Sequence, residues 1–226
     1  MNKYSIIIPI HNEFNRIPSL LNGLDDFIKK GHQIIIVDDG SNDGSREILA
    51  RIEKISLVIL YENMGKGYAI NKGLSKVINS KVVIYDGDLE LNPLHINNLM
   101  LLDKSNNIRC VLGYRYKSLK PVKSNFDWGN FVFTSFFNII LNSNFKDILC
   151  CAKAFYINDI NGYKLKSIGF DIDVELLTVL SRRFKKGSMT QVLLDYKRRS
   201  FDEGKKLQVS DGWVILGRII RMLRYL

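Results

Sequence analysis

Short apolar runs alternate with segments of helical periodicity along the first half of this sequence, and this alternation limits the fold more than any other feature. Four apolar runs each end at a polar turn; they cover residues 4–10, 33–37, 57–61 and 81–85. Between them, apolar residues recur every three or four positions, as on one face of a helix. Strands that are apolar throughout are typical of a parallel sheet with helices on both faces. The sequence therefore predicts an α/β fold with a Rossmann-like, mostly parallel central sheet.

The second half of the chain is less regular. We expect strands at 111–113, 152–156 and 189–196, an apolar helix at 126–141, and helices at 171–184 and 210–226. A chain of 226 residues has room for one large domain, and no internal repeat or low-complexity linker marks a boundary within it. We therefore expect a main domain over residues 1–208, followed by a C-terminal amphipathic helix over residues 209–226.

Polar clusters follow the apolar runs of the first half, at the point where each predicted strand ends. These clusters lie at residues 11–13, 38–39, 63–67 and 86–90. In a parallel sheet the carboxyl ends of the strands meet at one edge, and ligands bind there. Four turns therefore predict a ligand site at this edge.

The last of these clusters carries three carboxylates at alternate positions, Asp86, Asp88 and Glu90. An extended chain points alternate side chains to the same side. Concentrated negative charge is costly without a cation, and hard oxygen ligands favour Mg²⁺ or Mn²⁺. The cluster predicts a metal site that holds a substrate diphosphate. A solvated acidic turn is the alternative. A phosphatase with an aspartate nucleophile usually has Thr or Val at the position of Glu90, which disfavours that class.

Two further turns carry groups that can bind the ribose, the base or the phosphates of a nucleotide. Asp38 and Asp39 follow a predicted strand, where a carboxylate can accept hydrogen bonds from ribose or a base. Gly65-Lys66-Gly67 can bring backbone N–H groups and an ammonium toward a phosphate, although the Ser or Thr of a P-loop is missing. A helix-capping turn and a plain turn are the respective alternatives.

The net charge of +10 is concentrated at the end of the chain. From Arg182 onward there are twelve Lys or Arg and four Asp or Glu, a net of +8. Such an excess predicts an anionic partner, which can be a membrane surface, a phosphate-bearing ligand or a nucleic acid. Arg115 and Arg199 suit phosphate oxygens, whereas solvated surface charge is the alternative. Aromatic residues do not interleave with Lys and Arg as in an RNA-binding sheet, so we expect no nucleic-acid partner.

The predicted C-terminal helix places Arg218, Arg221 and Arg224 at every third position beside apolar residues. This pattern suits a helix at an anionic membrane surface; the alternative is a helix packed on its own domain with the arginines outward. No run reaches the about 18 apolar residues of a membrane span, and no signal peptide is visible. Three cysteines without paired spacing indicate reduced thiols. We expect a cytoplasmic protein, peripheral on the cytoplasmic face of the membrane.

These motifs, in this order, resemble the family 2 glycosyltransferases, which have a GT-A fold. The resemblance rests on residues 8–13, 37–41, 63–67 and 86–88, and it spans roughly residues 4–212. Within that family, the chain looks like the dolichol- and polyprenyl-phosphate mannose or glucose synthases. This narrower match rests on residues 113–116, Asp147, Gly169-Phe170 with Glu175, and Arg199 with residues 204–206.

The resemblance implies roles for the matching positions, which fall into four overlapping groups. The donor would be bound by Pro9, Asn12, Glu13, Asp38, Asp39, Lys66 and Asp86. The metal ion, Mg²⁺ or Mn²⁺, would be held by Asp86, Asp88 and Glu90. The acceptor and its phosphate would be bound by Arg115, Lys123, Arg199 and Lys205. The catalytic group would comprise Asp86, Asp88, Arg115, Asp147 and Arg199.

The implied reaction is an inverting, metal-dependent transfer of a sugar from a nucleotide diphosphate sugar, UDP-sugar or GDP-mannose, to a polyprenyl phosphate. A phosphate acceptor is largely anionic at pH 7 and needs no strong general base. The alternative acceptor is a hydroxyl of a surface polysaccharide or lipid-linked oligosaccharide. That acceptor needs a base, for which Asp147, Asp171 and Glu175 are the candidates. A non-catalytic sugar-nucleotide or membrane-binding protein is disfavoured by the complete acidic cluster.

Overall fold

A computed structural model describes residues 2–116, 125–184, 187–200, 203–204, 206, 208 and 210–223. Its centre is a seven-stranded sheet with the strand order β3-β2-β1-β4-β6-β5-β7. The strands are β1 (Tyr4–Ile10), β2 (Gln33–Asp39), β3 (Ser56–Leu60), β4 (Lys81–Ile84), β5 (Cys110–Tyr114), β6 (Lys153–Tyr156) and β7 (Met189–Leu193). Strand β6 runs antiparallel to both of its neighbours, and the other adjacent strands are parallel. The prediction of a mostly parallel sheet is therefore confirmed.

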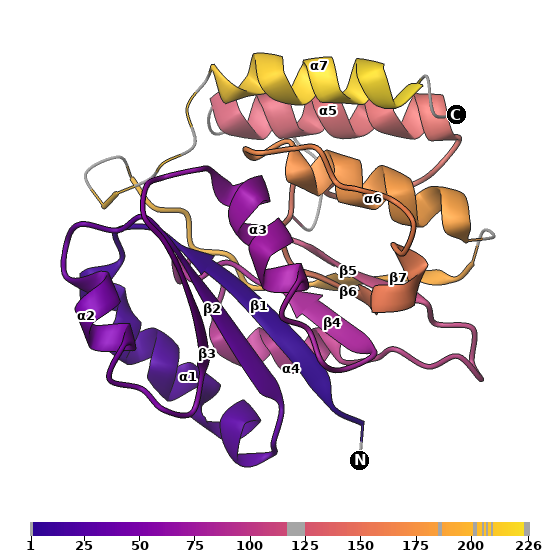
Figure 1. The fold of residues 1–226 in the computed structure, drawn as a ribbon. Coiled ribbons are helices and arrows are strands. Elements are labelled where there is room, and N and C mark those ends of the chain that lie inside the picture. The colour runs from indigo at the N-terminus through magenta and orange to yellow at the C-terminus, as the bar shows by residue number, and fades with distance from the viewer. Residues whose placement is uncertain are drawn as a thin grey trace.

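Helices cover both faces of the sheet (Figure 1). The helices are α1 (Ile17–Lys29), α2 (Ser45–Leu49), α3 (Lys66–Leu74), α4 (Ile96–Leu99), α5 (Asn125–Leu141), α6 (Ile172–Arg183) and α7 (Asp211–Leu223), with short 3₁₀ turns at Phe14–Arg16, Pro93–His95 and Ile157–Asp159. Helices α1, α2 and α4 pack on one face, while α3, α6 and α7 bury apolar side chains against the other. Helix α7 lies along α5 and α6 (Figure 1).

Alternation along β1 explains how one strand supports both layers. Ile6 and Ile8 belong to the core that α1 completes, whereas Ile7 between them belongs to the core beneath α3 and α6. All three are completely buried. Because successive side chains of a strand point to opposite faces, an unbroken apolar run fits only a strand covered on both sides.

Helix α2 stops at Leu49, where the amides of Arg51 and Ile52 bond the carbonyls three residues back and tighten the last turn. One predicted strand ends well before its expected end. Strand β7 ends at Leu193 rather than at Tyr196, because the chain leaves the sheet edge there. Tyr196 instead forms an isolated bridge with Leu91, beyond the end of β4. This crossing carries the next residues of the chain to the predicted ligand edge.

The C-terminal helix differs from the prediction in one respect. Its residues Ile215, Ile219 and Met222 are buried in the core, as expected of an amphipathic helix. Arg218, however, points inward and donates to Asp171 Oδ2 at 2.8 Å, so the interpretation of an outward stripe that includes Arg218 is wrong. Arg224 lies outside the described residues. The division at residue 208 stays a prediction.

Within the described residues, no helix combines the length and the apolar character that crossing a membrane requires. Cys110, Cys150 and Cys151 are buried and carry free thiols, as the sequence indicated.

Candidate active site

A cavity of about 680 Å³ lies at the carboxyl ends of β1, β2 and β4, where the polar turns predicted a ligand site. Of the residues predicted for the site, its wall contains Pro9, Glu13, Asp39, Lys66, Asp86, Asp88, Glu90, Arg115 and Arg199. The first half of the chain supplies every carboxylate in this group. The second half supplies both arginines. The cavity is therefore shared between the two halves.

Asp39 is fixed by the turn that precedes α3. Its two carboxylate oxygens accept hydrogen bonds from the backbone N–H groups of Met64 and Gly65 at 2.8 and 2.9 Å. Gly65 has a φ of 94°, a backbone conformation that favours glycine. The predicted Gly-Lys-Gly turn is thus held against the end of β2 and directs Lys66 toward the cavity.

Asp38 and Asn12 lie behind the wall rather than on it. Asp38 is completely buried and accepts hydrogen bonds from Arg46 Nε at 3.0 Å and from the Ser41 amide at 3.2 Å. Asn12 has a φ of 51°, and its Oδ1 accepts the Asn42 amide at 2.9 Å. Both side chains shape the turns after β1 and β2, and their assignment to donor binding stays a prediction.

Lys66 forms the centre of a buried charge network. Its Nζ lies 3.0 Å from Asp86 Oδ2 and 3.2 Å from Asp173 Oδ2, while Lys153 Nζ lies 2.7 Å from the other oxygen of Asp173. Burial alone would lower the pKa of Lys66, but Asp173 and Asp86 raise it well above its ordinary value. Burial would likewise raise the pKa of Asp173, but Lys153 and Lys66 outweigh it and hold that pKa below its usual range.

The sequence analysis missed Asp173, which lines the cavity, and Lys153 beneath it. A signal for Asp173 was present in the sequence, because it lies between apolar residues in a predicted helix. A carboxylate at such a position needs a cationic partner when it is buried, and Asp173 is 4% exposed in the structure. Lys153 gives a similar signal, because it lies in a predicted apolar strand, and it is 1% exposed in the structure.

Arg199 links the carboxylates at the ends of β1 and β4. Its Nη2 lies 3.0 Å from Asp88 Oδ2, and its Nη1 lies 3.1 Å from both oxygens of Glu13. The Arg199 amide also donates to Glu90 Oε1 at 2.9 Å. Burial and the charge of Asp86 raise the pKa of Asp88 to about 6, although Arg199 opposes this. Lys206 adds a further contact to Glu13 at 2.6 Å.

Arg115 is held in place by Asp147. Two parallel hydrogen bonds of 2.8 and 3.0 Å join its guanidinium to the carboxylate, which also accepts the Arg115 amide at 3.2 Å. The guanidinium lies 5.5 and 5.2 Å from the ring centres of Tyr116 and Tyr196. Asp147 is buried and is not part of the wall, so it orients Arg115 from behind.

Arg198, which precedes Arg199 in the chain, joins the same aromatic pair. It donates to Tyr116 Oη at 2.8 Å and to Tyr196 Oη at 3.3 Å. Asp127, in the first turn of α5, accepts from its Nη1 at 3.0 Å. Two guanidinium groups therefore lie against two tyrosines on one side of the cavity.

The two other candidate bases have structural partners. Asp171 accepts from Arg218 and from the Gly169 amide, and Glu175 accepts from Tyr163 and from two backbone amides at residues 166 and 167. Both carboxylates hold the segment that leads to the cavity wall. Lys123 and Lys205 lie outside the described residues.

The acidic residues after β4 fit a shared metal site rather than a preformed cage. No group of three or more His, Cys, Asp or Glu side chains is arranged to hold a metal ion in the part of the chain that the structure describes. Asp86 and Asp88 both line the cavity, and each faces a cation, Lys66 and Arg199 respectively. Mg²⁺ commonly takes one or two carboxylates together with substrate phosphates and water. The donor set fits an ion that arrives with a diphosphate.

A mostly parallel sheet with helices on both faces and a cavity at the carboxyl ends of its strands is the arrangement of the GT-A class. The chain belongs to glycosyl transferase family 2, whose sequence pattern matches residues 5–168. The sequence-based resemblance to this family is therefore confirmed.

Two curated relatives are undecaprenyl-phosphate 4-deoxy-4-formamido-L-arabinose transferases. The one from Aeromonas hydrophila is 34% identical over 104 residues, which cover 42% of this chain and 32% of the relative. The one from Yersinia pestis is 32% identical over 108 residues, which cover 44% and 33%. The matched region is thus about a third of the length of these relatives.

Solved structures of similar fold include glucosyl-3-phosphoglycerate synthase from Mycobacterium tuberculosis. Its complex with Mn²⁺, UDP and glucosyl-3-phosphoglycerate has a TM-score of 0.78 at 17% identity, covering 99% of this chain and 80% of that one. Its complex with Mn²⁺, UDP-glucose and glycerol 3-phosphate has a TM-score of 0.77 at 17% identity, with the same coverage. At this level of identity, the similarity establishes the fold.

Proposed function

We propose that this chain is an inverting, metal-dependent glycosyltransferase that moves a sugar from a nucleotide diphosphate sugar to a polyprenyl phosphate. The observation that carries the proposal is the two-part lining of the cavity. The wall from the first half of the chain carries Asp86 and Asp88, and the wall from the second half carries Arg115 and Arg198. A donor diphosphate at the carboxylates and an acceptor phosphate at the arginines would meet in this cavity, and inversion requires that the acceptor attack the sugar from the side away from the diphosphate.

The acidic wall supports metal dependence. Asp86 and Asp88 would hold a Mg²⁺ or Mn²⁺ ion, with Glu90 beside them. When bound, such an ion supplies positive charge for the diphosphate of the leaving nucleotide. Lys66 and Arg199 neutralise these carboxylates in the structure, and both line the cavity, so both would be available to phosphate oxygens if a metal ion were held by the carboxylates.

The other candidate carboxylates are engaged in ion pairs, which favours a phosphate acceptor over a glycan hydroxyl. A hydroxyl acceptor needs a general base with a free carboxylate. Asp147 is engaged by Arg115, and Asp171 by Arg218. Asp173 lines the cavity, but two ammonium groups keep its pKa low, which makes it a weak base. The names of the undecaprenyl-phosphate transferases that match part of the chain support the same acceptor.

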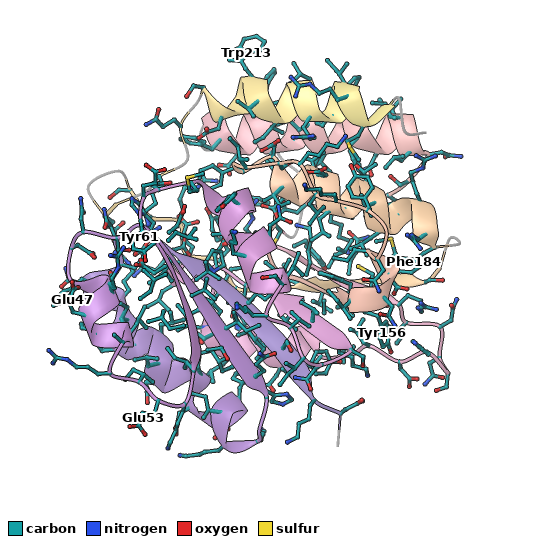
Figure 2. All side chains as sticks on the ribbon, in the orientation of Figure 1. Glu47, Glu53, Tyr61, Tyr156, Phe184 and Trp213 are labelled. Atoms are coloured by element: carbon teal, nitrogen blue, oxygen red, sulfur yellow. The ribbon has the colours of Figure 1, made fainter. Side chains whose placement is uncertain are left out.

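Helices α5 and α7 support docking on an anionic membrane surface. Trp128 and Ile139 on α5 are 58% and 79% exposed, and Trp213 on α7 is 76% exposed and points away from the molecule (Figure 2). Tryptophan favours the boundary between apolar and aqueous regions. The net charge of +10 over the whole chain suits anionic headgroups. The N-terminal parts of both helices line the cavity, so docking would bring its mouth to the lipid.

A donor screen tests the central proposal. The purified chain is mixed with Mn²⁺, a panel of UDP-sugars and GDP-mannose, and a short polyprenyl phosphate, and release of the nucleotide diphosphate is measured with and without the lipid. We expect release that depends on the lipid phosphate, that stops with EDTA, and that yields a product of inverted anomeric configuration by NMR. Nucleotide diphosphate release that does not depend on the lipid but rises with an oligosaccharide would identify a glycan, and not a lipid phosphate, as the acceptor.

Membrane docking is measured separately by sedimentation with vesicles of phosphatidylglycerol and phosphatidylcholine. We expect Trp213→Ala to lower vesicle affinity by roughly tenfold, the equivalent of about 1.4 kcal/mol. Tyr61→Ala is the matched control, because Tyr61 is 96% exposed but follows β3, away from α5 and α7. Equal losses in both variants would contradict docking through these helices.

A further inference from the structure

Asn130 carries an unused hydrogen-bond donor at the wall of the cavity. It lies in α5, is 3% exposed and lines the cavity. Its Oδ1 accepts a hydrogen bond from Thr134 Oγ1 at 3.4 Å, whereas its Nδ2 has no partner among the described residues. Buried polar atoms nearly always have a partner in a folded protein. An unpaired amide donor at a cavity wall therefore points to an atom of a ligand.

The neighbouring Thr134 determines which end of the amide is presented. The Ile148 amide donates to Thr134 Oγ1 at 3.4 Å, and the Thr134 hydroxyl in turn donates to Asn130 Oδ1 at 3.4 Å. The NH₂ group is then the end of the Asn130 amide that is left for a ligand. Because an NH₂ group only donates, the ligand atom must be an acceptor such as an oxygen.

The surroundings of Asn130 select an anionic oxygen. Asp127 lies three residues earlier on α5, on the same face, and accepts a hydrogen bond from Arg198. Arg198 in turn donates to the hydroxyls of the two tyrosines whose rings lie against Arg115. Asn130 therefore belongs to the wall that carries two guanidinium groups. Guanidinium groups attract phosphate oxygens, so a phosphate is the group that would meet all three donors.

We propose that Asn130 Nδ2 donates a hydrogen bond to a phosphate oxygen of the acceptor and makes α5 a specificity-determining part of the acceptor subsite. The inference rests on the proposed function, since it assigns one contact within the acceptor phosphate site. The two guanidinium groups attract the negative charge of the phosphate, and the Asn130 amide orients it through a directional hydrogen bond. An acceptor without an oxygen at this point leaves the buried amide unpaired, and sites built in this way reject such analogues strongly.

The test uses farnesyl phosphate as the probe and isothermal calorimetry as the first measurement. We expect Asn130→Leu to weaken farnesyl phosphate binding at least tenfold and to raise the KM for this acceptor at least as much, while the KM for the donor stays within twofold of wild type. The melting temperature of this variant should stay close to that of wild type, because loss of the long hydrogen bond from Thr134 is offset by removal of an unpaired buried donor. A purely structural role would not produce this combination.

Asn138→Asp is the matched control on the same helix. Both ends of the Asn138 amide are used within the fold: Nδ2 donates to the Phe145 carbonyl at 2.8 Å, and Oδ1 accepts from Ser143 and the Phe145 amide. We expect this variant to melt at a lower temperature and to bind farnesyl phosphate like wild type. Asn130→Ser is measured in the same way and takes the place of Asn130→Leu if the leucine variant does not fold.

The possible outcomes separate this inference from the proposed function. Unchanged farnesyl phosphate binding in both Asn130 variants would overturn the role of Asn130, whether or not wild type transfers sugar. A rise in the donor KM with an unchanged acceptor KM would also overturn it, because the amide would then serve the donor. If wild type binds farnesyl phosphate through Asn130 but transfers no sugar to it, the proposed function fails while the assignment of Asn130 stands. Absence of any farnesyl phosphate binding by wild type would overturn both.

Discussion

The two walls of the cavity are built in different ways. On the wall from the first half of the chain, carboxylates such as Asp39 are positioned by backbone amides of neighbouring turns at the ends of parallel strands. On the wall from the second half, Arg115 and Arg198 are positioned by single carboxylates far away in the sequence. The first wall therefore follows from the sheet topology. The second wall depends on specific ion pairs, so substitution of one carboxylate can displace the arginine that it holds.

Removal of Asp88 should give the largest effect and tests whether the first wall performs chemistry. We expect Asp88→Asn to lower sugar transfer on the order of 10²–10³-fold, because the variant loses a charged group of the proposed metal site. The measurement is lipid-dependent release of the nucleotide diphosphate. Asp195→Asn is the control, since the side chain of Asp195 is 95% exposed. A fully active Asp88→Asn enzyme would show that the Asp88 carboxylate is not needed for the transfer.

Removal of Asp173 tests the network that joins the two walls. We expect Asp173→Asn to lower the free energy of unfolding by about 4 kcal/mol, because the ammonium groups of Lys66 and Lys153 lose a buried partner. The pKa of Asp173 is lower in the folded chain than in the unfolded one, where it is about 4. The ion pair therefore stabilises the fold above pH 4, and this contribution is lost as the pH falls through the folded-state pKa.

Urea unfolding of wild type and Asp173→Asn between pH 3 and pH 7 measures this prediction. The difference in unfolding free energy should be largest near neutral pH and should shrink toward pH 3. A difference that does not change with pH would mean that Asp173 acts by packing rather than by charge.

Removal of Asp147 tests whether the second wall depends on single ion pairs. We expect Asp147→Asn to cost about 3 kcal/mol of unfolding free energy, because Arg115 is mostly covered and loses a buried bidentate partner. The acceptor KM should rise while the donor KM stays unchanged. Asp127→Asn is the contrast, because its partner Arg198 is more exposed, with 25% side-chain exposure against 17% for Arg115. Equal stability losses in both variants would count against the burial argument.

Gly67→Ala tests the backbone contact between the halves and should have the smallest of these effects. A Cβ atom at Gly67 would lie 2.4 Å from the Ser167 carbonyl oxygen, so the two segments must separate. We expect a loss of about 2 kcal/mol in unfolding free energy, as for overpacked sites. Gly217→Ala is the control, since nothing lies within 4 Å of a Cβ atom there. Thermal denaturation of both variants gives the comparison.

The same contrast explains what the sequence predicted. The strands and the edge where their turns meet follow from local periodicity, so β1 and α5 match their predicted ranges to within a residue. Asp173 and Lys153 were missed because each acts through an ion pair with a residue that only the fold brings near. Asp38 matches a family motif, yet the structure places it against Arg46, behind the wall. Sequence order cannot distinguish a residue that lines a cavity from one that supports the turn beneath it.

The contacts of Arg199 have a consequence for the order in which the molecule is assembled. Arg199 joins Glu13, 186 positions earlier, and Asp88, 111 positions earlier. A protein is synthesised from its N-terminus, and its early segments leave the ribosome first. Both carboxylates therefore exist in the nascent chain long before the guanidinium that balances them. The cavity reaches its final charge only after Arg199 has been synthesised, and a polypeptide that stops short of Arg199 lacks the cation that joins Glu13 and Asp88.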